Sequence, residues 1–349
     1  MKKIRVGING FGRIGRAFFK IAWDRPEIEI VAINDLSNVE NLAYLLKYDT
    51  VYHEWKHDIK TNGQEIIIDG KAVKVLTEKD PSKLPWEDFN IDVVVESTGL
   101  FTTFDKAKMH IDAGAKKVVI TAPARDEGNE KGETILLGVN EEKFGTCDIT
   151  SNASCTTNAA SPLIAILDEA LGIEKAILNT VHGYTASQSL VDGLSKKPAR
   201  PGSAGGDMRE GRAAAQNIVP SSTGAAIAVT KAFTKLSGLF DGISIRVPVV
   251  AGSIVDITFI SKKETTAQEV NAILKKASKD KRWENIFSVT EEPLVSSDIL
   301  GSHYGSIADL AMTRVVGGNL VKVMAWYDNE MGYTYTLIDH VIKTGNTIN

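Results

Sequence analysis

Cys155 and His182 are of the two residue types that thiol-based nucleophilic catalysis needs. Cys155 lies in a run of small and hydroxylic residues, 151–158, that leads into an apolar pattern typical of a helix. At a helix start, unpaired backbone N–H groups and the helix dipole favour thiolate over thiol. His182 follows an apolar run, 176–181, and a histidine beside such a sulfur can accept and return a proton. The two residues therefore predict a nucleophilic thiol with an acid–base partner.

Each residue also has an ordinary alternative. A lone cysteine is commonly a small buried apolar residue, and a lone histidine is commonly a hydrogen-bonded core residue. Cys147 is a useful comparison, because it precedes a strand-like run and no helix start follows it. We interpret Cys147 as structural and Cys155 as the reactive thiol.

A glycine motif near the beginning of the chain predicts a dinucleotide site. Residues 4–8 form a strand-like run, and Gly10, Gly12 and Gly15 follow before a pattern of helical spacing. In this context Gly10 allows a tight turn, Gly12 lets the backbone approach a pyrophosphate, and Gly15 lets helix and strand pack closely. Glycines in ordinary turns are the alternative.

Asp35 supplies the acidic residue that such a motif requires. It follows the strand-like run 28–34, and a carboxylate at this position accepts hydrogen bonds from a ribose 2′-OH while repelling a 2′-phosphate. The sequence therefore favours NAD over NADP. The ordinary role for Asp35 is that of a turn or capping residue.

An anion site is predicted in the second half of the chain. Hydroxyl groups and a glycine in residues 220–226 precede a helical pattern, which suits either a phosphate site or a plain N-cap. Arg246 lies in an apolar strand-like run, 243–248, where a guanidinium needs an anionic partner. This arginine favours the phosphate site.

The elements that hold the first set of residues alternate between strand and helix, which indicates an α/β fold. The continuous apolar runs 92–96 and 117–120 are typical of parallel strands buried on both faces. Residues 66–68 and 71–76 predict a hairpin appended to this sheet. Trp86 is expected to anchor the polar connection 81–90.

The second half has a different pattern. Runs 255–260 and 320–325 alternate between apolar and polar residues, as in an antiparallel sheet with one packed face, and 267–277 is an amphipathic helix. With 349 residues, the chain is long enough for two domains. The prediction is a doubly wound α/β nucleotide-binding domain followed by an α+β domain with a mostly antiparallel sheet.

Bulk properties exclude several classes of protein. A net charge of −4 gives no reason to expect a nucleic-acid partner or an anionic membrane. Two cysteines exclude a disulfide framework and a cysteine-based metal cluster, and we predict no metal site. The start of the chain lacks the apolar core of a signal peptide, and no run is long enough for a membrane helix. We expect a cytoplasmic protein.

The residues 151–158, Ser-Asn-Ala-Ser-Cys-Thr-Thr-Asn, closely resemble the active-site signature of phosphorylating glyceraldehyde-3-phosphate dehydrogenases. The resemblance extends from Val6 to the last predicted helix, 334–343. It implies a Rossmann-type NAD-binding domain, 1–154, completed by a C-terminal helix within 327–349, and a catalytic domain, 155–326. It also implies a homotetramer, and a bound NAD whose nicotinamide ring faces Cys155.

The resemblance further implies a reaction and a set of binding residues. Glyceraldehyde 3-phosphate, NAD and inorganic phosphate would give 1,3-bisphosphoglycerate through a Cys155 hemithioacetal and thioester, in glycolysis or gluconeogenesis. Residues expected to contact NAD are Asn9, Gly10, Gly12, Arg13, Ile14, Gly15, Asp35, Lys79, Thr121 and Asn329. Thr185 and Arg246 are expected to hold the substrate phosphate, and Ser154, Thr156, Thr223 and Gly224 the attacking phosphate.

Four features depart from the family pattern. Ile227 replaces a usual lysine and Glu210 a common arginine, which predicts less positive phosphate sites. Met331 replaces a more usual Trp or Thr, which we expect to be tolerated. The loop 195–212 is longer and richer in Pro and Gly than usual, which leaves its subunit contacts and part of the cofactor selectivity open.

Two other functions are alternatives to this one. An erythrose-4-phosphate dehydrogenase of the same superfamily would hydrolyse the thioester. A nucleotide-sensing protein would keep the fold and lose the chemistry, and its Cys155 would react as an ordinary slow thiol.

Overall fold

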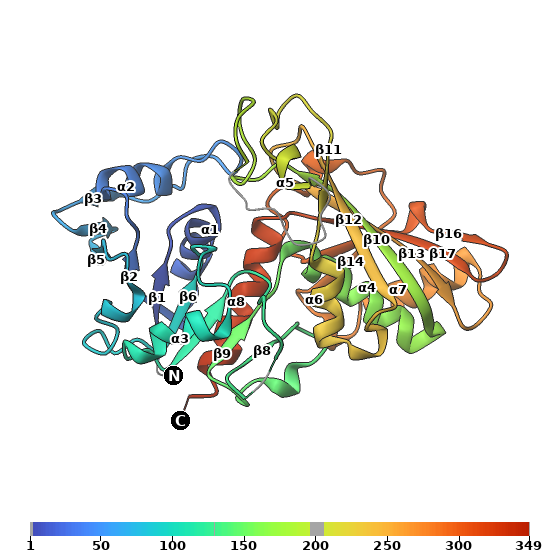
Figure 1. Ribbon diagram of the computed structural model, residues 1–349, viewed down its shortest axis with the longest axis horizontal. Helices are drawn as coiled ribbons and strands as arrows, with labels where there is room; N and C mark the ends of the chain where they lie inside the picture. Colours follow the sequence, from blue (N-terminus) through green and yellow to red (C-terminus); the bar gives the residue numbers. More distant parts are fainter. Residues whose placement is uncertain (1–2, 129, 196–205, 349) are drawn as a thin grey trace. The chain divides into compact units, whose positions relative to one another are not determined.

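The computed structural model describes residues 3–128, 130–195 and 206–348, so most of the predicted long loop, 196–205, lies outside the described residues. The chain forms two compact units (Figure 1). The first comprises Met1–Ala153 and Thr334–Asn349, and the second comprises Ser154–Tyr333. Each unit contains one large sheet.

The sheet of the first unit is mostly parallel and has the order β3-β4-β5-β2-β1-β6-β7-β9-β8. Only the pairings of β4 with β3 and β5 are antiparallel within it. Its strands are β1 (Ile4–Asn9), β2 (Ile28–Asn34), β3 (Ile59–Thr61), β4 (Glu65–Ile68), β5 (Lys71–Leu76), β6 (Val93–Glu96), β7 (Lys117–Ile120), β8 (Gly132–Thr134) and β9 (Ile149–Ser151).

The predicted hairpin is confirmed as β4 and β5, but it is not merely appended to the sheet. β5 also pairs in parallel with β2, with Ala32 opposite Lys74, so the hairpin extends the main sheet. The backbone of β5 thus hydrogen-bonds to a strand at each edge, while the side chains of Val73 and Val75 are buried on one face of the sheet.

Strand β1 occupies the point where the strand order reverses. The chain runs from β1 outward through β2, and later returns on the other side of β1 through β6 and β7. In open α/β sheets, ligands bind beyond the carboxyl ends of the strands at such a point. The glycine motif lies there, with Gly10 and Gly12 between β1 and helix α1 and Gly15 in the first turn of that helix.

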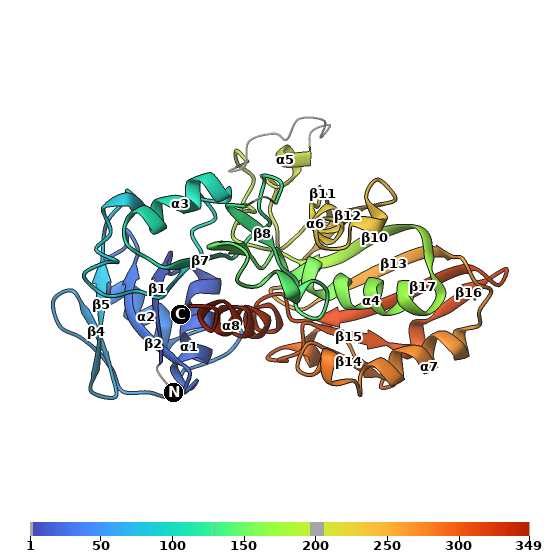
Figure 2. The same ribbon diagram turned by 90° about the horizontal axis from the view of Figure 1, so that it is seen from below.

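Helices cover both faces of this sheet; Figure 2 shows α1 and α3 on opposite sides. The helices are α1 (Arg13–Trp23), α2 (Val39–Lys47), α3 (Phe104–Asp112) and α8 (Met331–Gly345). Helix α8 starts three residues before the predicted start at Thr334. Helix α1 begins directly after Gly12, and its first turn contains Gly15, so a helix follows β1 at the glycine motif, as the sequence predicted.

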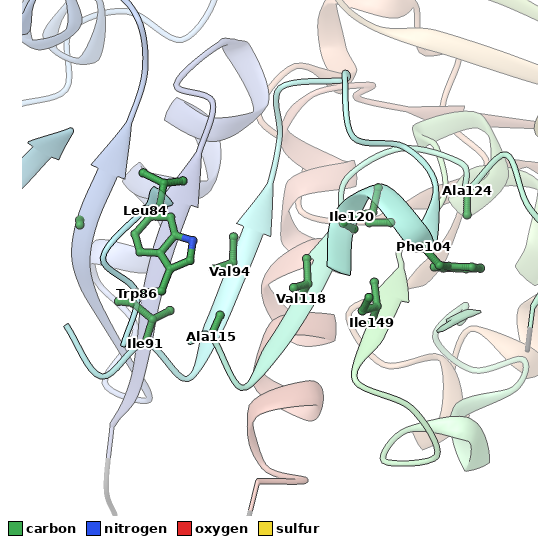
Figure 3. Packing of buried hydrophobic residues seen from close by; sticks show 12 residues of the cluster. Leu84, Trp86, Ile91, Val94, Phe104, Ala115, Val118, Ile120, Ala124 and Ile149 are labelled. Carbon is green, nitrogen blue, oxygen red and sulfur yellow. The ribbon is translucent and has the colours of Figure 1, made fainter. Parts of the chain in front are cut away.

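One apolar cluster holds β6 and β7 against the neighbouring elements (Figure 3). Trp86 is fully buried in it beside Val94, which confirms the predicted anchor of the 81–90 connection. Gly7 must be small, because an added Cβ would lie 2.9 Å from the Trp86 ring. The cluster and Gly7 therefore pack the 81–90 connection against β1 and β6, the strands next to the glycine motif.

The second unit has a mostly antiparallel sheet with the order β11-β12-β10-β13-β17-β15-β14, and β16 pairs with β17. The pairings β10–β12 and β14–β15 are parallel. Its strands are β10 (Ile173–Gly183), β11 (Val219–Ser222), β12 (Phe240–Val247), β13 (Ser253–Ser261), β14 (Phe287–Thr290), β15 (Ser306–Asp309), β16 (Arg314–Val316) and β17 (Leu320–Tyr327). The predicted architecture of both sheets is confirmed.

Helices cover one face of the second sheet; α4 and α7 lie on the same side in Figure 2. The helices are α4 (Cys155–Leu171), α5 (Gly206–Arg209), α6 (Ala225–Ala232) and α7 (Ala267–Ala277). Residues of β13 such as Val255 and Ile257 are buried, while Ile254 and Asp256 between them are partly exposed. The opposite face of the sheet is therefore left open within this unit.

The part of the chain that the structure describes contains no helix long and apolar enough to span a bilayer.

Candidate active site

Helix α4 places Cys155 at its first residue, as the sequence predicted. Ala153 adopts the left-handed region at φ 53°, which turns the chain sharply before the helix. Ser154 caps the helix, because its Oγ accepts a hydrogen bond from the Thr157 N–H at 3.2 Å. The sulfur therefore lies beside the N–H groups of the first turn.

His182 lies close to this sulfur. Its Nε2 is 3.4 Å from Cys155 Sγ, and its ring is buried with 3% exposure. His182 is near the end of β10, where the parallel pairing with β12 puts Arg246 directly beside it. The structure therefore brings together Cys155, His182 and Arg246, which are far apart in sequence.

The other ring nitrogen of His182 lies between two groups. Nδ1 is 2.6 Å from the Gly183 carbonyl oxygen and 2.5 Å from Arg246 Nη1. The Gly183 carbonyl can only accept and the Arg246 guanidinium can only donate, so these two contacts favour opposite tautomers of His182. When Nδ1 carries the hydrogen and donates to Gly183, Nε2 has a lone pair directed at the thiol. In that tautomer His182 can accept the proton of Cys155.

The surroundings of the pair shift the pKa values of both groups from their ordinary values. Burial raises the pKa of the Cys155 thiol, although the Arg246 charge and the Thr156 N–H and hydroxyl oppose this rise. Burial, followed by the Arg246 charge, lowers the pKa of His182 to about 3. At Cys155 the loss of solvation and the helix terminus therefore act in opposite directions, and the thiolate expected from the helix start stays a prediction.

Tyr327 supports this arrangement and was not identified from sequence. It is buried, and its hydroxyl lies 2.9 Å from Thr156 Oγ1 and 2.7 Å from Thr180 Oγ1. Its ring packs edge-on against His182, with 5.9 Å between ring centroids. Burial raises the pKa of Tyr327, so the phenol stays protonated. The sequence did contain a signal for this role, because Tyr327 ends an apolar strand and the hydroxyl of a buried tyrosine usually needs a hydrogen-bond partner.

Arg246 has the character of an anion site. Its Nε is buried and has no hydrogen-bond partner among the described residues, while Nη1 contacts only the His182 ring and, at 3.4 Å, the Gly183 carbonyl. A guanidinium with an unused buried donor fits a phosphate group. Thr185 lies two residues beyond β10, and its hydroxyl contacts that of Ser187 at 3.0 Å.

Thr223 and Gly224 immediately precede α6, which packs against α4 and β12. The Thr223 hydroxyl accepts a hydrogen bond from the Ala225 N–H at 3.2 Å. No hydrogen bond in the described part of the chain joins either residue to Cys155 or Arg246. The structure therefore places them at a helix N-terminus but does not connect them to the thiol.

The two departures in this region have different surroundings. Ile227 is 55% exposed on α6, where the lysine usual in the family would have reached solvent. Glu210 is buried, and its carboxylate accepts a hydrogen bond from Ser221 at 2.8 Å. Glu210 thus contacts β11, directly before Thr223.

Asn329 presents its amide nitrogen. Its Oδ1 accepts hydrogen bonds from the Gly252 N–H and the Ser253 hydroxyl, both at 3.0 Å. Ser253 Oγ in turn accepts the Gly183 N–H at 3.2 Å, which ties Asn329 to the residue after His182. Among the described residues none accepts a hydrogen bond from Asn329 Nδ2, so this group can donate to a ligand amide.

In the first unit, the glycine motif forms a cradle. Gly10 has φ 94°, and an added Cβ would lie 2.6 Å from the Thr98 backbone nitrogen. A Cβ on Gly15 would overlap the Gly10 carbonyl oxygen. Gly12, the N-cap of α1, instead faces open space with no atom within 4 Å of an added Cβ. This open position beside the start of α1 fits a dinucleotide pyrophosphate.

The remaining predicted cofactor residues differ in what they offer. Asp35 accepts the Phe11 N–H at 2.8 Å and the Ser37 N–H at 3.0 Å, so it braces the cradle. Arg13 is paired with Asp49 at 2.6 Å, and the Asn9 side chain is buried against Glu96 and Asn34.

Three others have few contacts of their own. Ile14 lies in the first turn of α1, and the Thr121 hydroxyl donates to the Glu96 carbonyl at 3.1 Å. Lys79 is exposed and forms no ion pair within the described ranges. Lys79 therefore offers an exposed ammonium group. Arg13 and Asn9, whose side chains already have partners, offer a ligand mainly their backbone groups.

No group of three or more His, Cys, Asp or Glu side chains in the described residues could hold a metal ion. Both cysteines are free thiols. Cys147 is buried, which raises its pKa, and its Sγ donates to the Ile149 carbonyl oxygen at 3.3 Å.

Comparison with known proteins identifies relatives of both units. Residues 4–104 match the family described as glyceraldehyde 3-phosphate dehydrogenase, NAD binding domain, and residues 154–329 match its C-terminal domain. Glyceraldehyde-3-phosphate dehydrogenase 2 of Streptomyces avermitilis is 45% identical over 348 residues, covering 99% of each chain. The Thermotoga maritima enzyme is 47% identical over 338 residues, covering 96% of this chain and 97% of its own. Glyceraldehyde-3-phosphate dehydrogenase 1 of Bacillus subtilis is 44% identical over 347 residues, covering 98% and 99%.

Two glycine substitutions should separate folding from cofactor binding. Gly15→Ala overlaps backbone and should lower the free energy of unfolding of the free protein by about 1–3 kcal/mol. Gly12→Ala should cost less than about 1 kcal/mol, the scale of a changed N-cap, but should weaken NAD binding at least about tenfold. Thermal melts without NAD and titration with NAD measure the two effects. Parent-like NAD affinity in Gly12→Ala would contradict the proposed pyrophosphate position.

Replacing His182 with Asn should remove the proton acceptor at Cys155. We expect the rate of aldehyde oxidation to fall about 10²–10⁴-fold, the usual contribution of a positioned acid–base group. His303→Asn, on an exposed histidine of the same unit, is the matched control and should retain parent activity. Steady-state NADH formation by both variants is the measurement. More than a tenth of parent activity in His182→Asn would refute the role.

Proposed function

Because this chain belongs to the glyceraldehyde-3-phosphate dehydrogenase family, we propose that it oxidises glyceraldehyde 3-phosphate to 1,3-bisphosphoglycerate, using NAD and inorganic phosphate. The observation that carries the proposal is the Cys155–His182 contact of 3.4 Å beside a guanidinium with an unused buried donor. These groups provide a nucleophile, a base and an anchor for a phosphorylated aldehyde.

The first half of the reaction joins the substrate to the protein. Cys155 Sγ attacks the aldehyde carbon while its proton passes to His182 Nε2 and then to the carbonyl oxygen, giving a hemithioacetal. His182 next removes the proton of that hydroxyl as hydride leaves the same carbon, and a thioester remains. NAD, when bound, supplies the hydride acceptor.

The second half releases the product. An oxygen of inorganic phosphate attacks the thioester carbon, and the C–S bond breaks as the acyl phosphate forms. His182, which holds a proton from the preceding step, returns it to the sulfur. The N–H of Cys155 and nearby threonine groups stabilise the oxyanion that forms during the attack. Thr156 is held for this purpose by Tyr327.

Anion binding divides between two sets of residues. Thr185 and Arg246 hold the phosphate of the substrate, and Ser154, Thr156, Thr223 and Gly224 hold the attacking phosphate. The buried carboxylate of Glu210 and the uncharged Ile227 leave the second set less positive than in a chain with the usual basic residues.

The cofactor is held by groups that fit its parts. The N-terminus of α1 beside Gly12 receives the pyrophosphate, and Asp35 accepts from the adenosine ribose. Asn329 donates from Nδ2 to the nicotinamide carboxamide. A carboxylate at position 35 also disfavours the 2′-phosphate of NADP.

The protein functions as a homotetramer in the cytoplasm. Two free thiols suit a reducing compartment. Self-association is supported by the open face of the second sheet, where Ile177 is 60% exposed and Ile243 51% exposed. Apolar side chains gathered on one uncovered sheet face favour burial against a second chain.

Phosphate dependence tests the reaction. Purified protein mixed with glyceraldehyde 3-phosphate and NAD should form NADH continuously only when inorganic phosphate is present, because the thioester otherwise persists. Absorbance of NADH with and without phosphate is the measurement. Sustained turnover without phosphate would instead identify a thioester-hydrolysing enzyme, such as an erythrose-4-phosphate dehydrogenase. No turnover together with a slow, ordinary rate of Cys155 alkylation by iodoacetamide would favour a sensor.

Charge on the open sheet face should disrupt the tetramer. The double substitution Ile177→Lys and Ile243→Lys places two charges where the proposal requires desolvated contact, so the particle should fall to two chains or one. Leu100→Lys, at an exposed apolar position of the first unit, is the control. Light scattering after size-exclusion chromatography gives the mass. A tetrameric double variant would show that this face is not an interface.

A further inference from the structure

Glu96 is a buried acid that neither the reaction nor the predicted binding residues account for. It ends β6 with 2% exposure, in an otherwise apolar strand. Its Oε1 accepts hydrogen bonds from the Thr98 N–H at 2.9 Å and from the Thr98 hydroxyl. Its Oε2 accepts from Asn9 Nδ2 at 2.6 Å and from His110 Nε2 at 3.0 Å. Four donors thus converge on one carboxylate.

The role of His110 in this network follows from its second partner. The Trp86 indole N–H, which can only donate, lies 3.0 Å from His110 Nδ1. Nδ1 must therefore accept, and in the neutral ring the hydrogen is on Nε2, directed at Glu96. His110 is fully buried, so both ring nitrogens are used within the core.

The network holds the two segments that form the dinucleotide cradle. Asn9 and Glu96 are register partners on β1, where the strand order reverses, and on the neighbouring strand β6. Asn9 Oδ1 accepts from Asn34 Nδ2 at 2.7 Å, so the Asn9 amide is fixed at both ends. On the other side, the Ser97 hydroxyl donates to the Gly10 carbonyl at 2.6 Å.

Thr98 completes the connection. A Cβ added to Gly10 would lie only 2.6 Å from the Thr98 backbone nitrogen. The turn of the glycine motif therefore packs directly on Thr98. A shift of Thr98 or Asn9 would therefore displace Gly10 and the N–H groups that follow it. Both residues are positioned by the same carboxylate.

Glutamine has nearly the same shape as glutamate but cannot replace it here. The NH₂ group of a glutamine amide only donates hydrogen bonds. In either orientation this group would face two other donors, which are Asn9 Nδ2 and His110 Nε2–H on one side and the Thr98 N–H and hydroxyl on the other. Since burying an anion costs free energy unless donors compensate it, the four donors explain how the charge is tolerated.

The geometry points to Glu96 as a positioning residue for NAD, one that sets the conformation of the glycine cradle without touching the cofactor. This inference rests on the NAD-dependent activity proposed above. It assigns Glu96, together with His110 and Thr98, to cofactor affinity and not to the chemistry at Cys155.

Glu96→Gln tests the assignment. We expect the KM and the Kd for NAD to rise about ten- to a hundredfold, because lost or reversed hydrogen bonds in the core displace the cradle. The kcat at saturating NAD should stay within about threefold of the parent, a separation that general destabilisation would not produce. Glu87→Gln, on an exposed glutamate of the same unit, is the matched control and should change neither quantity.

Thr98→Ala is a milder second variant, because it removes one hydroxyl donor and leaves the backbone N–H in place. It should raise the Kd for NAD by a smaller factor, about three- to tenfold. Quenching of tryptophan fluorescence by NAD gives Kd without turnover, so the inference is measured even if the proposed reaction fails. Thermal melts without NAD report folding.

Three outcomes would overturn the assignment. The first is parent-like Kd for NAD in folded Glu96→Gln and Thr98→Ala. The second is a fall in kcat at unchanged KM, which would place Glu96 in the chemistry. The third is failure of both variants to fold, which would make the network purely structural.

Discussion

The parallel pairing of β10 with β12 is the constraint on which the catalytic arrangement depends. Within a mostly antiparallel sheet, this pairing sets His182 beside Arg246 on neighbouring strands. Because side chains alternate along a strand, a register slip of one residue would turn either of them to the open face of the sheet. Helix α4 packs on the buried face of this sheet and brings Cys155 to the same point. The contact of thiol and imidazole therefore results from strand register and helix packing together.

The same closeness has an electrostatic cost. Burial, followed by the Arg246 charge, lowers the pKa of His182 to about 3, so protonating the ring is less favourable here than in water. A proton held on His182 during the reaction therefore needs negative charge nearby, on the Cys155 sulfur or on a phosphate at Arg246. Phosphorylated substrates bring that charge with them.

Local patterns predicted much of the fold and singled out Cys155 and His182, which the structure brings together. The glycine motif, the following helix and Asp35 lie within one strand–helix–strand segment, so spacing alone locates them. The state of the Cys155 thiol depends instead on burial by residues far apart in sequence. For the same reason, sequence could not show that Asp49 pairs with Arg13 or that the Asn9 side chain is used inside the core.

Groups poised for a ligand in this protein share a physical design, in which one part of a side chain is fixed so that another stays available. Asn329 is held through Oδ1, which leaves Nδ2 to donate. Arg246 contacts His182 through Nη1 and keeps a buried Nε without a partner among the described residues. A fixed donor loses little conformational freedom when a ligand arrives, so more of the interaction is realised as affinity. Buried residues with no ligand contact, such as Tyr327 and Glu96, are then as necessary as those that bind, because they determine which atoms are left available.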